Sequence, residues 1–387
     1  MDTQKLDQTY IANTYARFPV TIVKGKGSLV WDDTGKEYID LSTGIAVDIF
    51  GVADEEWMAA VTKQLGTLQH ISNLYYTEPC VKLAQVLCEK TGMKKVFFGN
   101  SGAEANECAI KAARKWSEEK KGKDYSTIIT LKNSFHGRTI TTLAATGQDV
   151  FHHDFTPLTE GFVYAEPNDL ANLEQLIKAN KCAAVMMEVV QGEGGVMPLD
   201  EAYVKGAAKL CEQYDLLLIC DEVQVGNGRS GKLYGYMHYG VQPDIVSTAK
   251  GLAGGLPLGA TLLGEKVQDV LSAGTHGSTF GGNPVCCAGA INVLSRLDEK
   301  MLEGVEERSA YIKQELAGAK GVLGVSGLGL MLGIQTEKNA SDIIAACREK
   351  GVLVIKAKDK LRLLPALNIP MEQLQKAVAV IKACCAE

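Results

Sequence analysis

The chain has 387 residues, and 40 Lys and Arg against 46 Asp and Glu give it a formal net charge of −6. With 46% hydrophobic and 22% charged residues its composition is that of a globular protein, which excludes a disordered or collagen-like chain. The mild acidity, without any basic block, argues against nucleic acid and anionic membranes as main partners, and the length favours two domains.

A small β element comes first in the chain. Residues 20–41 hold alternating runs around the turn sequence Asp-Asp-Thr-Gly, which predicts a hairpin. Further on, apolar runs of strand length alternate with helical segments: the predicted strands are 95–101, 127–131, 183–190, 216–220, 244–249 and 260–264, and the predicted helices are 103–122, 170–181 and 201–215. Because these strand segments are apolar throughout, we expect them to be buried on both faces of a parallel sheet.

The last hundred residues have a different pattern. One long helix is predicted over 285–318, and it is followed by a strand (331–335), a helix (340–350), a strand (352–357) and a final helix (371–385). This order predicts a smaller α+β domain.

Several features bear on where the protein works. No apolar run reaches the roughly 20 residues that a membrane helix needs, and the polar first residues predict no signal peptide. The eleven cysteines include two adjacent pairs, 286–287 and 384–385, but no Cys-x-x-Cys, which fits reduced thiols better than a disulfide framework. We therefore expect a cytoplasmic protein.

Polar residues follow four of the predicted strands, at the edge where α/β sheets bind ligands. Residues 99–102 run into a strong helix whose N-terminus would attract an anion such as phosphate, although an ordinary helix cap would look the same. Asp221 and Glu222 end a buried strand, where a carboxylate can hold a metal, orient a histidine, pair with a cofactor nitrogen or simply be solvated. Partial burial of Lys250 would lower its pKa and make it a nucleophile, while a lone lysine is more often a solvated charge.

The fourth group is Ser-Phe-His-Gly-Arg-Thr at 134–139. Phe135 could stack on a ring, and Arg138 could hold a carboxylate with two parallel hydrogen bonds. A turn with a core phenylalanine is the alternative interpretation.

Two other patterns carry little weight. Residues 226–231 fit the dinucleotide pattern G-x-G-x-x-G, and with Lys232 they fit a phosphate loop. The segment after them is a poor helix, and Leu233 stands where a phosphate loop has Ser or Thr, so we reject both interpretations. We expect no metal site, because His152 and His153 form the only His pair and the cysteines lack the spacing of zinc ligands.

Together, a phosphate-binding helix start, a ring-stacking Phe, a strand-end Asp and a later strand-end Lys are the parts needed to hold pyridoxal 5′-phosphate (PLP). Their order and spacing resemble those of the class III (subgroup II) PLP-dependent aminotransferases over nearly the whole chain. The motifs that carry the resemblance are FFGNSGAEANE, SFHGRT, VVQGEGGV, LLICDEVQVGNGRSGK, TAKGLAGGLPLGA and THGSTFGGNP. The stretch GIAVDIFGVADEEW departs from the family, which commonly has a Gly-His pair and a Pro there.

The resemblance implies the α/β type I PLP-dependent transferase fold, a large domain with a mostly parallel central sheet plus a smaller α+β domain. We expect residues 1–50 to be an N-terminal segment of the small domain, 51–275 to form the large PLP-binding domain and 276–387 to form the C-terminal small domain. The family also implies a homodimer whose two active sites are shared between the subunits.

Roles carry over from the family by position. Lys250 matches the lysine that bonds covalently to the cofactor and later moves the substrate proton, and Asp221 matches the partner of the pyridine nitrogen; both are the expected catalytic residues. The remaining cofactor-binding positions are Ser101, Gly102 and Ala103 at the phosphate, Phe135 on the ring, Glu222, Val223 and Gln224 near it, and Thr279 from the other subunit.

The expected substrate-binding residues are Arg138, Glu193, Ser278 and Arg362. Arg362 matches the arginine that takes the α-carboxylate of glutamate or 2-oxoglutarate. Glu193 matches the glutamate that covers this arginine when an ω-amino substrate binds.

The implied reaction is a ping-pong transamination of N2-acetylornithine with 2-oxoglutarate, which gives N-acetylglutamate 5-semialdehyde and glutamate in arginine biosynthesis. The sequences HISNLYYTEP and THGSTFGGNP favour this donor, while succinylornithine, ornithine and 4-aminobutyrate remain alternative amine donors. A nicotinamide-dependent oxidoreductase is the less favoured alternative, because it rests on residues 226–231 alone.

Overall fold

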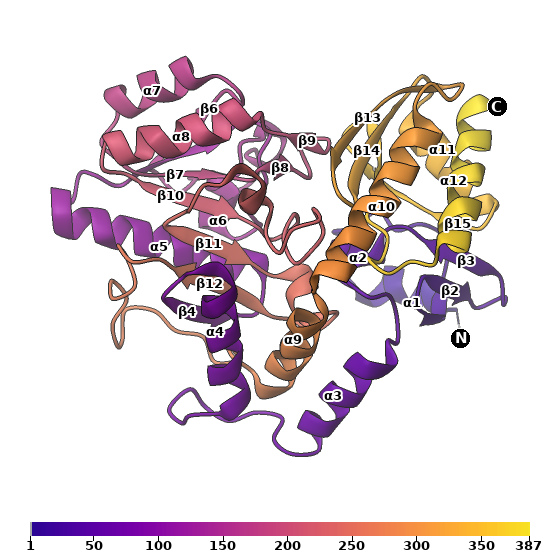
Figure 1. Ribbon diagram of the computed structural model, residues 1–387, viewed down its shortest axis with the longest axis horizontal. Coiled ribbons are helices and arrows are strands. Elements are labelled where there is room, and N and C mark those ends of the chain that lie inside the picture. Colours follow the sequence, from indigo (N-terminus) through magenta and orange to yellow (C-terminus); the bar gives the residue numbers. More distant parts are fainter. Residues whose placement is uncertain (1) are drawn as a thin grey trace.

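A seven-stranded sheet forms the centre of the computed structural model, which describes residues 2–387 (Figure 1). The strand order is β4-β12-β11-β10-β7-β5-β6, and every strand except β12 runs in the same direction. The strands are β4 (Lys95–Gly99), β5 (Thr127–Leu131), β6 (Phe162–Ala165), β7 (Cys182–Met187), β10 (Leu217–Asp221), β11 (Ile245–Thr248) and β12 (Gly259–Leu263). The predicted α/β class with a mostly parallel central sheet is therefore confirmed.

Burial explains why these segments lack polar alternation. Every residue of β7, β10, β11 and β12 is buried, because helices cover both faces of the sheet. In Figure 1, α7 and α8 lie on one side of the sheet and α5 lies on the other. The α-helices are α1 (Thr3–Tyr10), α2 (Thr43–Ala46), α3 (Glu55–Leu65), α4 (Glu78–Thr91), α5 (Gly102–Lys121), α6 (Ile140–Ala145), α7 (Leu170–Ala179), α8 (Glu201–Gln213), α9 (Pro284–Arg296), α10 (Glu299–Leu316), α11 (Ala340–Glu349) and α12 (Met371–Ala386).

The remaining elements are smaller. One four-stranded sheet has the order β13-β14-β17-β16, another has the order β1-β2-β3-β15, and β8 pairs with β9. Their strands are β1 (Ile22–Lys26), β2 (Leu29–Asp32), β3 (Glu37–Asp40), β8 (Val190–Gln191), β9 (Met197–Pro198), β13 (Val322–Leu328), β14 (Met331–Thr336), β15 (Val352–Leu353), β16 (Ile355–Ala357) and β17 (Lys360–Leu363), and the short 3-10 helices are η1 (Asp149–Phe151), η2 (Gly235–Tyr239) and η3 (Lys250–Ala253). The β1-β2-β3 strands thus pair with a strand from near the end of the chain.

Three predictions about the elements need correction. The strand predicted over 352–357 is two strands, β15 and β16, which belong to different sheets. Residues 20–41 form three strands rather than a simple hairpin, with the predicted Asp-Asp-Thr-Gly turn between β2 and β3. The helix predicted over 285–318 is two helices, because Leu297 leaves the helical conformation and the Asp298 side chain accepts a hydrogen bond from the Met301 N–H, which starts α10. Asp298 is a typical residue for the start of a helix, but the apolar periodicity continues across it, so the break is not visible in the periodicity alone.

Two general features concern the chain as a whole. All eleven cysteines are free thiols. Within residues 2–387, no helix combines the length and apolar character needed to cross a membrane.

Candidate active site

The carboxyl ends of the parallel strands bring the predicted polar groups together. Asp221 ends β10, and Lys250 opens η3 two residues after β11 ends. The charges of Glu193, Arg362 and Asp221 all act on the Lys250 amine. Residues from three other stretches of the sequence therefore act on one lysine, as expected for the edge where open α/β sheets bind ligands.

Lys250 has the properties of a reactive amine. Part of its surface is open to solvent, yet the amine lies deep among protein atoms, and this burial lowers the pKa of Lys250 to about 8, against an opposing effect of the Glu193 charge. The amine donates no hydrogen bond to any other residue among 2–387. Its backbone has a φ of 47°, a left-handed conformation that a lysine rarely adopts and that stores strain at this position.

Asp221 is held by buried neighbours. One carboxylate oxygen, Oδ2, lies 2.7 Å from Asn106 Nδ2 and 2.8 Å from His136 Nδ1, while Oδ1 accepts the Val223 N–H at 3.0 Å. Asn106 also donates to the His136 carbonyl at 2.7 Å, so the three side chains fix one another. No role was predicted from the sequence for Asn106 or His136. Both residues lie inside motifs that carry the family resemblance, so the sequence pointed to these stretches. Only the fold shows that the two side chains meet at Asp221.

The start of α5 offers unpaired N–H groups. The Ser101 hydroxyl accepts the Glu104 N–H at 3.2 Å, and the Glu104 carboxylate accepts the Asn100 N–H at 2.9 Å, as in a capped helix. The N–H groups of Gly102 and Ala103 have no hydrogen-bond partner among residues 2–387. The stretch is therefore both an ordinary helix cap and a candidate anion site, because the helix is capped and two N–H donors remain for an anion.

Phe135 and Arg138 lie beside a second phenylalanine. The Phe135 ring meets the Phe151 ring edge-on at 5.8 Å, and the Arg138 guanidinium lies over the Phe151 ring at 4.3 Å. Arg138 is exposed and makes no ion pair within residues 2–387. A guanidinium held by rings and free of carboxylates is suited to hold a carboxylate from outside the chain.

Glu193 and Arg362 form the tightest charged contact of the site. Arg362 Nη1 lies 2.5 Å from Glu193 Oε1 and 3.0 Å from Gln224 Oε1. Burial raises the pKa of Glu193, but the charge and hydrogen bond of Arg362, together with the Lys250 charge and the Gln224 hydrogen bond, hold that pKa below its usual value. Arg362 itself is buried, and its Nε has no partner. The predicted pairing of these two residues is present in the structure.

Glu188 is a buried carboxyl that was not predicted from the sequence. Its two oxygens accept the Phe135 N–H at 2.8 Å and the Gly192 N–H at 3.2 Å. Burial raises the pKa of Glu188 to about 7, although the charge of His136 opposes the rise. This residue joins the stretch that carries Phe135 to the stretch that carries Glu193. The available signal was a glutamate inside the apolar run 183–190, which the structure places directly after β7.

Glu222 and Val223 lie next to Asp221 but are used differently. The Glu222 carboxylate accepts the N–H groups of Gly235 at 2.7 Å and Tyr236 at 2.9 Å, so its side chain anchors η2. Val223 packs on the start of α5, where a Cβ placed on Gly102 would come within 2.6 Å of it. Of the two, only Val223 lies against the start of α5, the stretch predicted to bind the phosphate. The role of Glu222 toward a cofactor stays a prediction.

Ser278 and Thr279 lie at the edge of this arrangement. The Ser278 hydroxyl accepts a hydrogen bond from Asn100 Nδ2 at 3.1 Å, which places it beside the start of α5 of the same chain. Thr279 is exposed and lines a separate shallow hollow with His70 and Asn73. No hydrogen bond within residues 2–387 joins Thr279 to Lys250, and the role predicted for Thr279 is toward the site of a second subunit.

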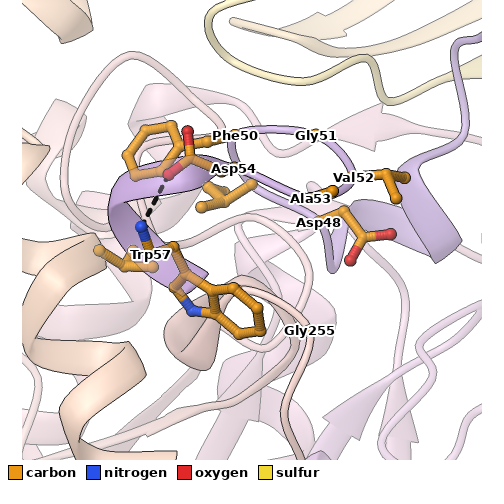
Figure 2. Close-up of a pocket in the computed structure, with 11 residues that line it drawn as sticks. Asp48, Phe50, Gly51, Val52, Ala53, Asp54, Trp57 and Gly255 are labelled. Atoms are coloured by element: carbon orange, nitrogen blue, oxygen red, sulfur yellow. Dashed lines mark hydrogen bonds between the residues drawn. The ribbon is translucent and has the colours of Figure 1, made fainter. Parts of the chain in front are cut away.

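A separate cavity of about 210 Å³ lies between residues 48–57 and the glycines that follow η3 (Figure 2). This is the stretch in which the sequence departs from the family pattern. Here the Asp54 side chain accepts the Trp57 N–H at 2.9 Å, which caps α3, and it also pairs with Arg296 Nη2 at 3.0 Å. Trp57 Nε1 donates to the Ala253 carbonyl of η3 at 3.0 Å. The unusual stretch is therefore well anchored to the turn that begins with Lys250.

The donor set fits PLP. Its phosphate needs N–H donors, which Gly102 and Ala103 have free, and its pyridine nitrogen needs a buried carboxylate, which Asp221 supplies. Its aldehyde needs an amine with a lowered pKa, which Lys250 supplies. The close contact of Gly102 with Val223 leaves no room for a side chain at the start of α5.

Comparison with known proteins gives the same class. The sequence pattern of the family Aminotransferase class-III matches residues 10–385. An acetylornithine aminotransferase of Haemophilus ducreyi is 50% identical over 386 residues, which cover 99% of this chain and 98% of the relative. A succinylornithine transaminase of Salmonella newport is 42% identical, with 97% of this chain and 94% of the relative covered.

Solved structures agree. An ornithine aminotransferase of Toxoplasma gondii, described with partial occupancy of PLP at its active site, has a TM-score of 0.94 and 34% identity, covering 99% of this chain and 93% of its own. The chain belongs to the class III aminotransferases. It is a PLP-dependent aminotransferase of the fold expected from its motifs.

Proposed function

We propose that this protein transfers the ω-amino group of N2-acetylornithine to 2-oxoglutarate, giving N-acetylglutamate 5-semialdehyde and glutamate in arginine biosynthesis. The observation that carries the proposal is the Arg362–Glu193 pair beside Lys250, because it suits an enzyme that must accept both an ω-amine and an α-amino acid at one place. The name of the acetylornithine aminotransferase that is 50% identical to this chain supports the choice of donor.

The residues around Lys250 have distinct tasks in this reaction. PLP, when bound, supplies an electron sink next to the substrate carbon that carries the amine. Gly102 and Ala103 would hold its phosphate by their N–H groups, and Asp221 would keep its ring nitrogen protonated. The neutral Lys250 amine would take the proton from the substrate carbon that carries the amine and hold it for return during the transfer of the amino group.

Glu193 and Arg362 then decide which substrates bind. The reacting end of an ω-amine has no carboxylate, so Glu193 stays on Arg362 and satisfies its charge. Glutamate and 2-oxoglutarate bring an α-carboxylate to this end, which displaces Glu193 and pairs with Arg362. Arg138 holds the distal carboxylate in both half-reactions.

We further propose a cytoplasmic homodimer with shared sites. Large apolar side chains are exposed close to Ser278 and Thr279: Leu74 is 86% exposed, Tyr76 98% and Phe280 60%. Exposed apolar side chains gathered in one region are typical of a surface that a second protein covers. Eleven free thiols support a reducing compartment.

A donor panel tests the proposed reaction. We expect kcat/KM with 2-oxoglutarate to be highest for N2-acetylornithine, when compared with N2-succinylornithine, ornithine and 4-aminobutyrate. The purified protein should absorb as a yellow PLP enzyme, and Lys250→Ala should lose both turnover and the covalent bond to the cofactor. A clear preference for ornithine or succinylornithine would replace the donor, while a protein that stays colourless after addition of PLP would overturn the reaction class.

Glu193→Ala tests the exchange at Arg362. Without Glu193 the arginine keeps only uncharged acceptors when an ω-amine binds, because Glu193 is its carboxylate partner. The donor half-reaction with N2-acetylornithine should therefore slow by about tenfold, which corresponds to roughly 1.4 kcal/mol. The half-reaction with glutamate does not use Glu193 and serves as the internal control. Equal effects on both half-reactions would contradict the exchange.

A further inference from the structure

Arg229, in the Gly-Asn-Gly-Arg-Ser-Gly stretch that resembled a nucleotide loop, is a fully buried cation that the proposed reaction does not use. No carboxylate pairs with it within residues 2–387. Burial alone lowers the pKa of Arg229 to about 9, so the side chain still carries its charge at neutral pH. Burying an unpaired charge is costly, so this arginine calls for an explanation.

The partners of Arg229 are main-chain atoms of two other segments. Its Nη1 donates to the carbonyl of Leu330 at 3.2 Å and to the carbonyl of Pro365. Its own carbonyl accepts the Leu330 N–H at 2.9 Å. Its Nε and Nη2 have no partner, so the side chain is aimed at these two carbonyls rather than at an anion.

Leu330 and Pro365 lie at one end of the β14–β17 pair. In this antiparallel pair Leu332 lies opposite Leu363 and Gly333 opposite Arg362. Two residues further out, the same register puts Leu330 opposite Pro365. Proline has no N–H to donate, so it cannot continue the ladder of hydrogen bonds between the two strands. Arg229 instead supplies a donor that binds the carbonyls of both segments at this end.

The same loop touches Arg362 at its other end. Gln224, five residues before Arg229, accepts a hydrogen bond from Arg362 Nη1 at 3.0 Å and donates to Glu193 at 3.4 Å. One loop therefore contacts both the guanidinium of Arg362 and the end of the strand that carries it.

We propose that Arg229 is a positioning residue for recognition of the α-carboxylate: by joining its loop to the end of the β14–β17 pair, it fixes where Arg362 lies relative to Gln224 and Glu193. The inference rests on the proposed function, in which Arg362 takes the carboxylate of 2-oxoglutarate. A small displacement of Arg362 weakens a two-point contact with a carboxylate, but it leaves the Lys250 chemistry in place.

Arg229→Met removes the guanidinium and keeps an apolar side chain that the buried site can hold. We expect the KM for 2-oxoglutarate to rise by about 10- to 100-fold, the size of effect that a misplacement of about 1 Å produces. The donor half-reaction with N2-acetylornithine, followed by the cofactor absorbance, should change by less than about threefold. In that half-reaction Arg362 pairs with the Glu193 side chain, which can follow a small displacement of the guanidinium, and no substrate carboxylate has to meet it. Arg229→Lys keeps one cationic donor and should recover part of the KM.

Arg308→Met is the matched control. Arg308 is also an arginine that donates to main-chain carbonyls, of Ile369 at 2.8 Å and Gly304 at 2.7 Å, but it does not contact the loop of Gln224. Its loss should leave the KM for 2-oxoglutarate unchanged. If Arg229→Met slows both half-reactions equally, or lowers only the melting temperature, Arg229 is merely structural and the proposal is wrong.

A measurement without cofactor or substrate separates this proposal from the proposed function. Amide hydrogen exchange of residues 361–367 in the cofactor-free protein should be faster in Arg229→Met and in Arg229→Lys than in the wild type, and unchanged in Arg308→Met. Unchanged exchange in the Arg229 variants would show that Arg229 does not hold the segment around Pro365 in place, and the proposal would be wrong. A wild type that does not use 2-oxoglutarate overturns the proposed function alone.

Discussion

Two short glycine-containing turns follow parallel strands in this molecule, and they behave in opposite ways. Residues 99–102 lead into α5, where the N–H groups of Gly102 and Ala103 remain unpaired. Residues 226–231 contain more glycine and fit a nucleotide-binding pattern, yet no α-helix follows them, and the N–H groups of Gly226, Gly228 and Gly231 all donate within the chain. The first turn can bind an anion, while the second is already satisfied by the protein.

The difference between the two turns limits the use of a glycine pattern as a predictor. An anion site needs unpaired N–H groups and the positive end of a helix, and both depend on the segment after the glycines rather than on the glycine spacing. Where the N–H groups pair internally, glycine instead lets the backbone pack tightly, as Gly228 does against Leu297 and Leu367. Substitutions in the two turns should therefore have different consequences.

The largest expected effect is on stability, from Gly228→Ala. Gly228 has a φ of 84°, and a Cβ there would lie 2.8 Å from Leu297 Cδ2 and 2.9 Å from Leu367 Cδ1. The left-handed conformation costs about 1–2 kcal/mol for alanine and the overpacking about 1–3 kcal/mol, so we expect a loss of roughly 2–5 kcal/mol in urea unfolding. PLP affinity of the folded variant should not change; a weaker affinity would show that this turn belongs to the cofactor site.

Gly102→Ala should act on the cofactor instead. Alanine suits the first turn of a helix, but its Cβ would lie 2.6 Å from Val223, whose N–H is bonded to Asp221. Displacing Val223 therefore disturbs Asp221, and a cost of about 1–3 kcal/mol corresponds to a PLP affinity lower by about 5- to 150-fold. Titration of the cofactor-free protein with PLP measures it, with Gly228→Ala as control. Unchanged affinity would separate Gly102 from the phosphate site.

The smallest effect concerns pH. Burial lowers the pKa of Lys250 to about 8, so the neutral, reactive fraction of the amine rises as the pH rises through 8. Recombination of the cofactor-free protein with PLP should accelerate by about tenfold from pH 7 to pH 9 and then level off. Arg229→Met should keep the same midpoint, because Arg229 is not among the charges that act on Lys250. A midpoint near 10 would show that Lys250 is not buried in solution.

Sequence reasoning predicted most of the strands and helices of the large sheet because apolar runs and helix caps are encoded by neighbouring residues. The apolar strands and the helix over 103–122 appear within one to three residues of the predicted bounds, since strand burial and helix capping leave marks in adjacent residues. The Leu297 break was missed because its cause is one capping side chain within a continuous apolar periodicity. The domain boundaries and the role of each site residue stay predictions.

The parts of the site that escaped prediction are joined over long distances in the chain. Asn106 and Asp221 are 115 residues apart, and Arg229 and Pro365 are 136 residues apart. No local spacing encodes such contacts, because they arise from strand order and register. Glu193 and Arg362 were paired in advance only because the family resemblance carried that information.

The pairing of β3 with β15 has a consequence for folding during synthesis. Ile39 lies beside Val352, and its N–H donates to the Gly351 carbonyl at 2.8 Å. About 310 residues separate the two strands, which at roughly 5–20 residues per second amounts to about 15–60 s of translation. During that time β3 is an open edge, the kind of strand to which other chains can add. The first strands to leave the ribosome are thus among the last to find all of their partners.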